Sequence, residues 1–231
     1  MKLKIAVVLI FVALAWVIGR SIAGGGRVSV PLVSNSGSGQ EEIHRSYKLE
    51  PGAQVEVRSI NGTVEIETAE TDAAEVHVVQ TAKHQSDLAG HEIIIEQNPR
   101  SLTVYGKKTE GHWWNFWGGG QVRQRVTLRI PRRVELTAKG VNGSVKVGEV
   151  DGALSLKGVN GGVELAQSAG LTEVSGVNGG VSVNVGRLGE QGLVVKGVNG
   201  GVELYLAGGL NADLHIKGLN GSVSNEVPNL T

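Results

Sequence analysis

Lys139-Gly140-Val141-Asn142-Gly143-Ser144-Val145 is the first of five closely related phrases between residues 134 and 227. The phrase returns around Asn160, Asn178, Asn199 and Asn220, so that consecutive asparagines are 18, 18, 21 and 21 residues apart. A sixth copy stands upstream, around Asn61. A period near 20 residues is typical of repeat proteins in which each unit stacks on the next.

Apolar and polar residues alternate on both sides of every Asn-Gly pair. The third residue after Asn is Val in all six copies, at positions 64, 145, 163, 181, 202 and 223. The third residue before Asn is basic in five copies, namely Arg58, Lys139, Lys157, Lys196 and Lys217, and is Ser175 in the sixth. The fourth residue after Asn is Glu65, Lys146, Glu164, Ser182, Glu203 or Ser224. Period-two alternation predicts a short strand on each side of the turn, with one dry and one wet face.

Two architectures fit these strands. Asn-Gly between alternating strands is a strong hairpin signature, because both residues tolerate positive φ. The alternative is a parallel β-solenoid, a β-helix-like fold in which Asn and Gly turn a corner and like residues stack from coil to coil. We favour the solenoid, because a hairpin turn demands nothing of the residue before Asn, which is Val, Ile or Leu in every copy. Stacked asparagines Asn61, Asn142, Asn160, Asn178, Asn199 and Asn220 would form an amide ladder along the corner.

Residues 1–23 are expected to be a targeting segment. Lys2 and Lys4 precede an apolar run, and Ser21 and Ala23 are small residues of the type read by a signal peptidase. The run from Ile5 to Ile18 is short for a membrane span, so we favour a cleaved signal peptide over an N-terminal anchor. Gly- and Ser-rich residues 24–42 are interpreted as a flexible tether.

Composition limits the remaining classes of protein. Thirty-five glycines without a collagen triplet fit a turn-rich β protein, and a net charge of zero gives no electrostatic footprint for nucleic acid. No cysteine is present, so disulfides contribute nothing to stability.

Residues 43–133 are expected to form a β-rich N-terminal part that caps the repeat array, residues 134–227 the array, and residues 228–231 a tail. A stack of coils needs a cap, because its first coil otherwise exposes an unpaired edge. The expected strands cover residues 43–49, 54–60, 63–68, 75–81, 92–97, 101–105 and 122–130.

The chain resembles the bacterial putative-adhesin family of β-strand-repeat domains of unknown function over roughly residues 43–227. The resemblance rests on Glu50-Pro51-Gly52-Ala53-Gln54-Val55-Glu56-Val57, on Val126-Thr127-Leu128-Arg129-Ile130-Pro131, and on the Asn-Gly array. It implies β-solenoids at the bacterial cell envelope, some of them connected with envelope stress. It brings no catalytic residues.

One stretch breaks the repeat pattern and is the candidate binding loop. Trp113, Trp114, Phe116 and Trp117 lie within five residues framed by glycines. Such a loop could bind a glycan, a membrane interface or a protein partner, or it could seal the core of the cap.

The remaining polar residues point to binding and not to catalysis. The Lys and Arg column before Asn could follow an anionic polymer, or it could be a solvated ladder balanced by the Glu column after Asn. The six histidines lack metal-ligand spacing, and no acid pair suits glycan cleavage. We therefore expect no metal, no cofactor and no enzymatic activity.

The sequence predicts an exported, non-catalytic binding or scaffolding module in the periplasm or at the cell surface, held at the membrane if its N-terminal segment is retained. The expected partner is an envelope surface, a glycan or a protein, not nucleic acid. An envelope-stress sensor or regulator acting through a protein partner is the alternative, and a glycan-active β-helix enzyme is a distant one.

Overall fold

The computed structural model describes residues 38–108, 122–166, 170–185 and 192–207. Most of these residues lie in strands, with one short helix, α2 (Gln85–Leu88). The strands in the first half are β1 (Gly39–Lys48), β2 (Ala53–Arg58), β3 (Gly62–Ala69), β4 (Ala73–Ala82), β5 (His91–Asn98), β6 (Ser101–Lys108) and β7 (Arg123–Pro131). The strands in the second half are β8 (Val134–Val141), β9 (Val145–Val147), β10 (Leu154–Val159), β11 (Val163–Leu165), β12 (Thr172–Asn178), β13 (Val181–Val185), β14 (Leu193–Asn199) and β15 (Val202–Leu206).

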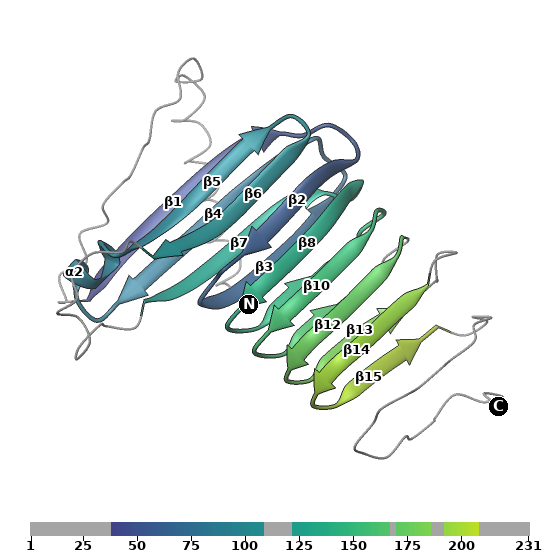
Figure 1. The fold of residues 1–231 in the computed structure, drawn as a ribbon. Coiled ribbons are helices and arrows are strands. Elements are labelled where there is room, and N and C mark those ends of the chain that lie inside the picture. The colour runs from purple at the N-terminus through teal and green to yellow at the C-terminus, as the bar shows by residue number, and fades with distance from the viewer. Residues whose placement is uncertain (1–37, 109–121, 167–169, 186–191, 208–231) are drawn as a thin grey trace, which may run out of the picture. The chain divides into compact units, whose positions relative to one another are not determined.

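The strands form two sheets, with neighbouring strands side by side as in Figure 1. The first sheet has the order β1-β4-β7-β3-β9-β11-β13-β15, and the second has the order β14-β12-β10-β8-β2-β6-β5. All strand pairs are parallel except β1 with β4, β4 with β7 and β5 with β6. The protein is thus all-β with two mostly parallel sheets, which is consistent with a β-solenoid-like fold.

The dry faces of both sheets share one core. Val64, Val145, Val163 and Val181 are paired in register on β3, β9, β11 and β13, and each is at most 3% exposed. Val57, Ala138, Leu156 and Val174 form the corresponding column of the other sheet, and each is fully buried. The alternation of the sequence therefore places every second side chain of a strand inside.

The order of the coils in space differs from their order along the chain. The β2–β3 coil is flanked by β8 and β9 on one side and by β6 and β7 on the other. The chain therefore leaves the stack after β3, forms β4 and β5 beyond the last parallel coil, and returns to insert β6 and β7. The antiparallel strands β1, β4 and β5 end the parallel stack at this side.

Strand β1 begins at Gly39, four residues earlier than the sequence suggested. Residues 39–42, which we assigned to the tether, pair with Val79–Ala82 of β4 and belong to the sheet. The expected signal segment, most of the tether and the tail lie outside the described residues. The described ranges contain no helical segment with the length and hydropathy of a membrane span.

A left-handed residue marks the same corner in successive coils. Gly140, Gly158, Gly176 and Gly197 have φ between 62° and 64°, and Ser59 of the upstream copy has φ 56°. Ser59 is the one described non-glycine residue with positive φ. A side chain with Cβ is strained in this conformation, whereas glycine adopts it without steric cost.

Replacing Ser59 with glycine is therefore expected to raise the free energy of unfolding by about 0.5–1 kcal/mol. The backbone hydrogen bond from Ser59 N to Lys139 O, 3.1 Å long, does not need the side chain. The measurement is the urea midpoint. Ser46→Gly is the control, because Ser46 lies in exposed β1 with ordinary φ and its replacement should lower the midpoint. A decrease in both variants would contradict the strain at Ser59.

Candidate functional site: the polar face and the asparagine corner

The asparagines at the repeat corner form a continuous chain of side-chain hydrogen bonds. The Nδ2 of each asparagine donates to Oδ1 of the asparagine in the coil before it, at 2.9–3.0 Å. The members of this ladder are Asn61, Asn142, Asn160, Asn178 and Asn199. Asn220 lies outside the described residues. All five described amides are exposed, so the ladder is a surface feature of the corner.

The ladder ends at Asn61, which forms hydrogen bonds with two groups that no sequence motif predicted. Asn61 Nδ2 donates to the backbone oxygen of Val122 at 2.8 Å, and Asn61 N donates to Gln124 Oε1 at 2.9 Å. Gln124 is only 4% exposed, so a buried side-chain amide terminates the hydrogen-bonded ladder at this corner. Val122 and Gln124 flank the start of β7, more than sixty residues away in sequence.

The candidate binding loop Trp113, Trp114, Phe116 and Trp117 lies outside the described residues. Its connections are nevertheless defined by the strands on either side. It joins β6 to β7, which pair with β2 and β3 respectively. The neighbouring coil makes the same connection, from β2 to β3, through Ser59, Ile60 and Asn61.

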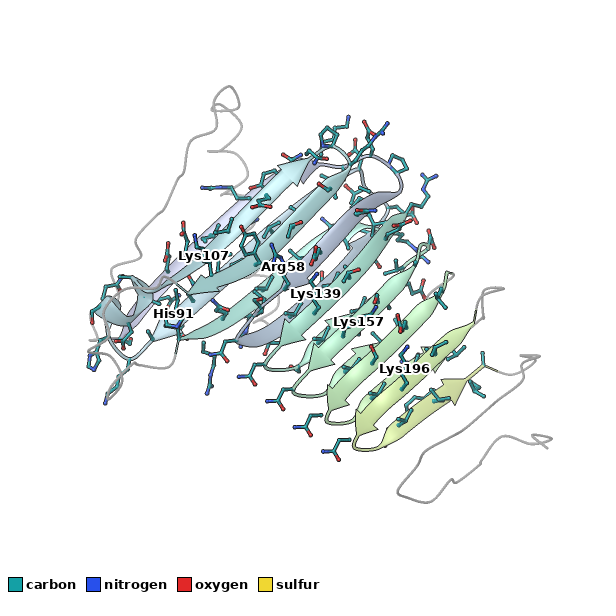
Figure 2. All side chains as sticks on the ribbon, viewed as in Figure 1. Arg58, His91, Lys107, Lys139, Lys157 and Lys196 are labelled. Atoms are coloured by element: carbon teal, nitrogen blue, oxygen red, sulfur yellow. The ribbon has the colours of Figure 1, made fainter. Side chains whose placement is uncertain are left out.

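Four cations lie in register across the outer face of the second sheet. Arg58, Lys139, Lys157 and Lys196 stand on β2, β8, β10 and β14, with Ser175 of β12 between the last two. Figure 2 shows these labelled side chains following one another across the strands. We call them the cation row. Their side chains are 39–61% exposed, so the row is open to solvent.

The acids that pair with the cation row are Glu56 and Glu173. Glu56 Oε1 lies 2.6 Å from Lys139 Nζ and 3.9 Å from Arg58 Nε. Glu173 lies 3.1 Å from Lys157 Nζ and 2.6 Å from Lys196 Nζ. Each acid thus serves two cations, and the four cations and two acids leave a net charge of +2.

The expectation that the Glu column after Asn balances the cation row is wrong. That column, exemplified by Lys146 and Glu164, lies on β9 and β11 of the other sheet. Lys146 Nζ pairs there with Glu164 Oε1 at 3.2 Å. The Asn-Gly corner takes the chain from one sheet to the other, so positions before and after Asn face opposite ways.

The paired lysines should make stability depend on the charge of Glu173. Hydrogen bonds from Lys196 and then from Lys157 lower the pKa of Glu173, against an opposing effect of burial. A carboxyl whose pKa is lowered on folding stabilises the fold above its ordinary pKa, and this contribution disappears as pH falls through the lowered pKa.

Glu173→Gln is therefore expected to lose less stability than the wild type when pH falls from about 7 to about 3, because it has no proton to take up at this site. Thermal midpoints across this range are the measurement. Parallel pH profiles for the two proteins would contradict the pairing.

Tyr105 extends the polar face beyond Arg58. The Arg58 guanidinium carbon lies 4.2 Å from the centre of the Tyr105 ring, and Tyr105 donates its hydroxyl hydrogen to Glu96 at 2.8 Å. This hydrogen bond raises the pKa of Tyr105. The guanidinium covers one face of the ring, so this face is not open for stacking on a sugar.

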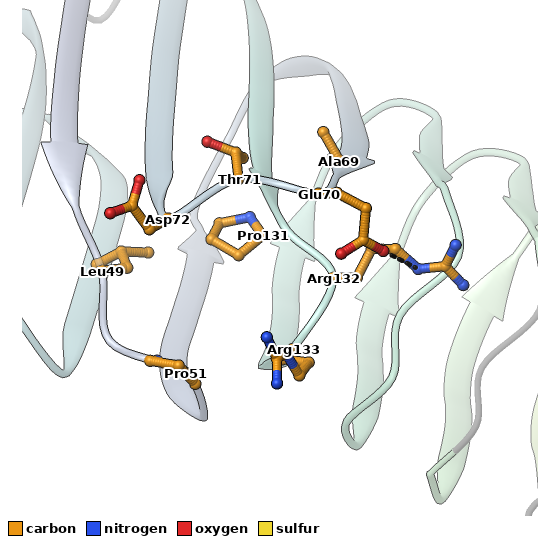
Figure 3. Close-up of a pocket in the computed structure, with 9 residues that line it drawn as sticks. All are labelled: Leu49, Pro51, Ala69, Glu70, Thr71, Asp72, Pro131, Arg132 and Arg133. Carbon is orange, nitrogen blue, oxygen red and sulfur yellow. Dashed lines mark ion pairs between the residues drawn. The ribbon is translucent and has the colours of Figure 1, made fainter.

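A cavity of about 300 Å³ lies at the other end of the strands, where β1, β3 and β7 end. It is lined by Leu49, Pro51, Ala69, Glu70, Thr71, Asp72, Pro131, Arg132 and Arg133 (Figure 3). Arg132 is already paired with Glu149 at 2.6 Å, Asp151 at 3.6 Å and Glu70 at 3.8 Å. The Arg132 guanidinium is thus engaged in ion pairs that link neighbouring turns.

No group of three or more His, Asp or Glu side chains within the described ranges could hold a metal ion. Among the described residues, the polar side chains that lie in register are found on the two outer sheet faces and along the asparagine corner.

Two mostly parallel sheets with polar columns in register are consistent with a β-solenoid-like fold. The family model described as Toastrack DUF4097 matches residues 53–227, and the chain belongs to this family. The resemblance stated from the sequence is thus confirmed. No curated protein matches the chain.

Three solved structures illustrate the similarity. A putative cell adhesion protein from Clostridium sporogenes ATCC 15579 has 11% identity and a TM-score of 0.39, over 72% of this chain and 100% of that chain. A putative adhesin from Bacteroides fragilis NCTC 9343 has 12% identity and a TM-score of 0.31, over 71% and 96%. A putative adhesin from Parabacteroides merdae ATCC 43184 has 16% identity and a TM-score of 0.30, over 73% and 79%.

Proposed function

We propose that the protein is an exported, non-catalytic binding or scaffolding module of the bacterial cell envelope, in the manner of an adhesin. The observation that carries the proposal is the repetition of polar groups across the stacked strands. The cation row offers positively charged side chains on four of five successive strands, which are about 4.8 Å apart. A surface of this kind suits an extended or repetitive ligand, because many weak contacts act together.

The fold provides a rigid support for such a surface. In this proposal the 18 to 21-residue Asn-Gly repeats are coils of a parallel β-solenoid, and residues 43–133 carry its β-rich cap. Residues 1–23 direct export or anchor the chain, and the following residues hold the folded part away from the membrane. The Trp113–Trp117 loop is a second candidate contact, at the connection between β6 and β7.

The ion pairs of the polar face argue against catalysis of glycan cleavage. Such catalysis needs a carboxyl group that stays protonated to act as a general acid. Glu173 instead has its pKa lowered by two lysines and is ionised at neutral pH. A regulator that binds one protein partner is the closest alternative, and it would bind with defined stoichiometry and not along a polymer.

Tryptophan fluorescence tests the proposal. In a chain carrying Trp16→Phe, emission comes only from Trp113, Trp114 and Trp117. The protein is titrated with anionic and neutral liposomes, purified cell-wall glycans and an envelope extract, and direct binding is followed by co-sedimentation. A blue shift with one additive would identify the loop as a contact and the ligand class.

Co-sedimentation without a fluorescence change would place binding on the sheet faces. Absence of co-sedimentation with every glycan, liposome and insoluble envelope fraction would overturn the proposal. A stoichiometric soluble protein complex in its place would favour the regulator.

A further inference from the structure

Two lysines in the middle of the cation row face each other without an acid between them. Lys139 of β8 and Lys157 of β10 are direct partners in the strand register. Lys139 pairs with Glu56 of β2 on one side, and Lys157 pairs with Glu173 of β12 on the other. The two ammonium groups are thus held by acids on opposite flanks, and the strip between them carries positive charge on both sides.

Hydroxyl groups lie next to this strip on the same outer face. Ser155 of β10 and Thr137 of β8 are register partners, two residues before the lysines on the same outer face. Ser155 Oγ is buried and has no hydrogen-bond partner. Buried hydroxyls normally have a partner, and one without a partner calls for a physical explanation. A ligand oxygen that displaces the groups covering Ser155 Oγ would accept its hydrogen bond.

We propose that an oxyanion group of a linear anionic polymer binds between Lys139 and Lys157, over Ser155 and Thr137. The polymer continues across the strands toward Arg58 on one side and Lys196 on the other, a distance of about 19 Å at roughly 4.8 Å per strand. This inference rests on the proposed binding function and names its ligand class.

A polymer fits the row better than a single small anion. Lys139 and Lys157 are 50% and 52% exposed, so solvent and salt weaken any one contact. A chain of linked anions gains from several such contacts at once and releases its counterions on binding. Glu56 and Glu173 do not block this, because each ammonium has three hydrogen-bond donors and each lysine side chain is about half exposed.

Binding of soluble polyanions tests the inference with the full-length chain in non-ionic detergent. The probes are inorganic polyphosphate, polygalacturonate and, as the uncharged control, dextran, each titrated at several salt concentrations. Binding of polyphosphate alone supports a phosphodiester polymer as the natural ligand, and binding of polygalacturonate alone supports a uronate polymer. Binding of both supports the shared oxyanion chemistry.

The double variant Lys139→Gln and Lys157→Gln is expected to weaken binding at least about tenfold. It should also lower the slope of log affinity against log salt by about 1.4, at roughly 0.7 for each lost contact. Lys146→Gln is the control for loss of positive charge elsewhere, because it removes one charge from the other sheet, half of what the double variant removes. Ser175→Lys should strengthen binding, because it fills the gap in the row between Lys157 and Lys196.

Ser155→Ala separates a ligand contact from a structural role. It should weaken binding while leaving the thermal midpoint unchanged or higher, because it removes a buried hydroxyl that has no partner in the fold. A lower midpoint would contradict this role for Ser155.

Two results overturn the inference. One is that neither polyanion binds better than dextran, and the other is that Lys146→Gln weakens binding as much as the double variant. Both leave the proposed function standing if the chain still co-sediments with envelope material. Loss of co-sedimentation is the separate result that would remove the proposed function.

Discussion

Replacing Gly161 with alanine is expected to lower the free energy of unfolding by about 2–4 kcal/mol. A Cβ at this position would lie 2.4 Å from the backbone oxygen of Gly143 in the coil before it. The clash is with backbone, so a side-chain rotation cannot relieve it, and the two coils would have to separate locally. Urea unfolding followed by circular dichroism gives the measurement.

Gly162→Ala is the matched control for this prediction. The nearest atom to a Cβ at Gly162 is the backbone oxygen of Gly180, 3.9 Å away, which is an ordinary contact. The repeats themselves tolerate side chains here, since Thr63 and Ser144 occupy the same position in other coils. We expect a change within about 0.5 kcal/mol. Equal losses in the two variants would show that close stacking of the corner is not what requires glycine.

The same close approach explains why the residue after Asn never varies. Added Cβ atoms at Gly62, Gly143, Gly179 and Gly200 would lie 1.7–2.4 Å from a backbone oxygen of the adjoining coil. The sequence suggested a turn residue that tolerates positive φ. The structure adds a second reason, because the backbones of adjacent coils leave no space for a side chain at this column.

The existence of strands could be predicted because its cause is local. Alternation of apolar and polar residues determines which side chains face inward, and the seven strands expected between residues 43 and 130 are all present with ends shifted by at most four residues. The order of strands in the sheets could not be predicted in this way. Insertion of β6 and β7 beside the β2–β3 coil depends on contacts between distant residues. The antiparallel pairing of β4 with β1 and β7, and of β5 with β6, leaves no repeat in the sequence.

The candidate face was recognised only in part for the same reason. Its basic column could be read from the repeats, because it has a fixed position relative to Asn. Its acidic partners Glu56 and Glu173 occur in only two coils, so they form no column. Pairing across strands, and the position of Ser155 next to the lysines on the same face, can be seen only when the coils are placed in register.

Val163→Asp is expected to lower the free energy of unfolding by more than about 4 kcal/mol. Val163 is 3% exposed and lies between Val145 and Val181 in the buried column. A carboxylate there would lose its hydration and find only aliphatic neighbours. The expected result is a thermal midpoint at least about 10 °C lower, or no cooperative transition.

Two further variants keep this prediction decisive even if Val163→Asp does not fold. Val163→Ala should cost about 1–3 kcal/mol, because it removes buried methyl groups without adding charge. Glu164→Gln changes the adjacent, outward residue, whose ion pair with Lys146 has both side chains 56% exposed, and should change stability by less than about 0.5 kcal/mol. A small loss at Val163 together with a large loss at Glu164 would mean that the outer face, and not the stacked aliphatic column, holds the coils together.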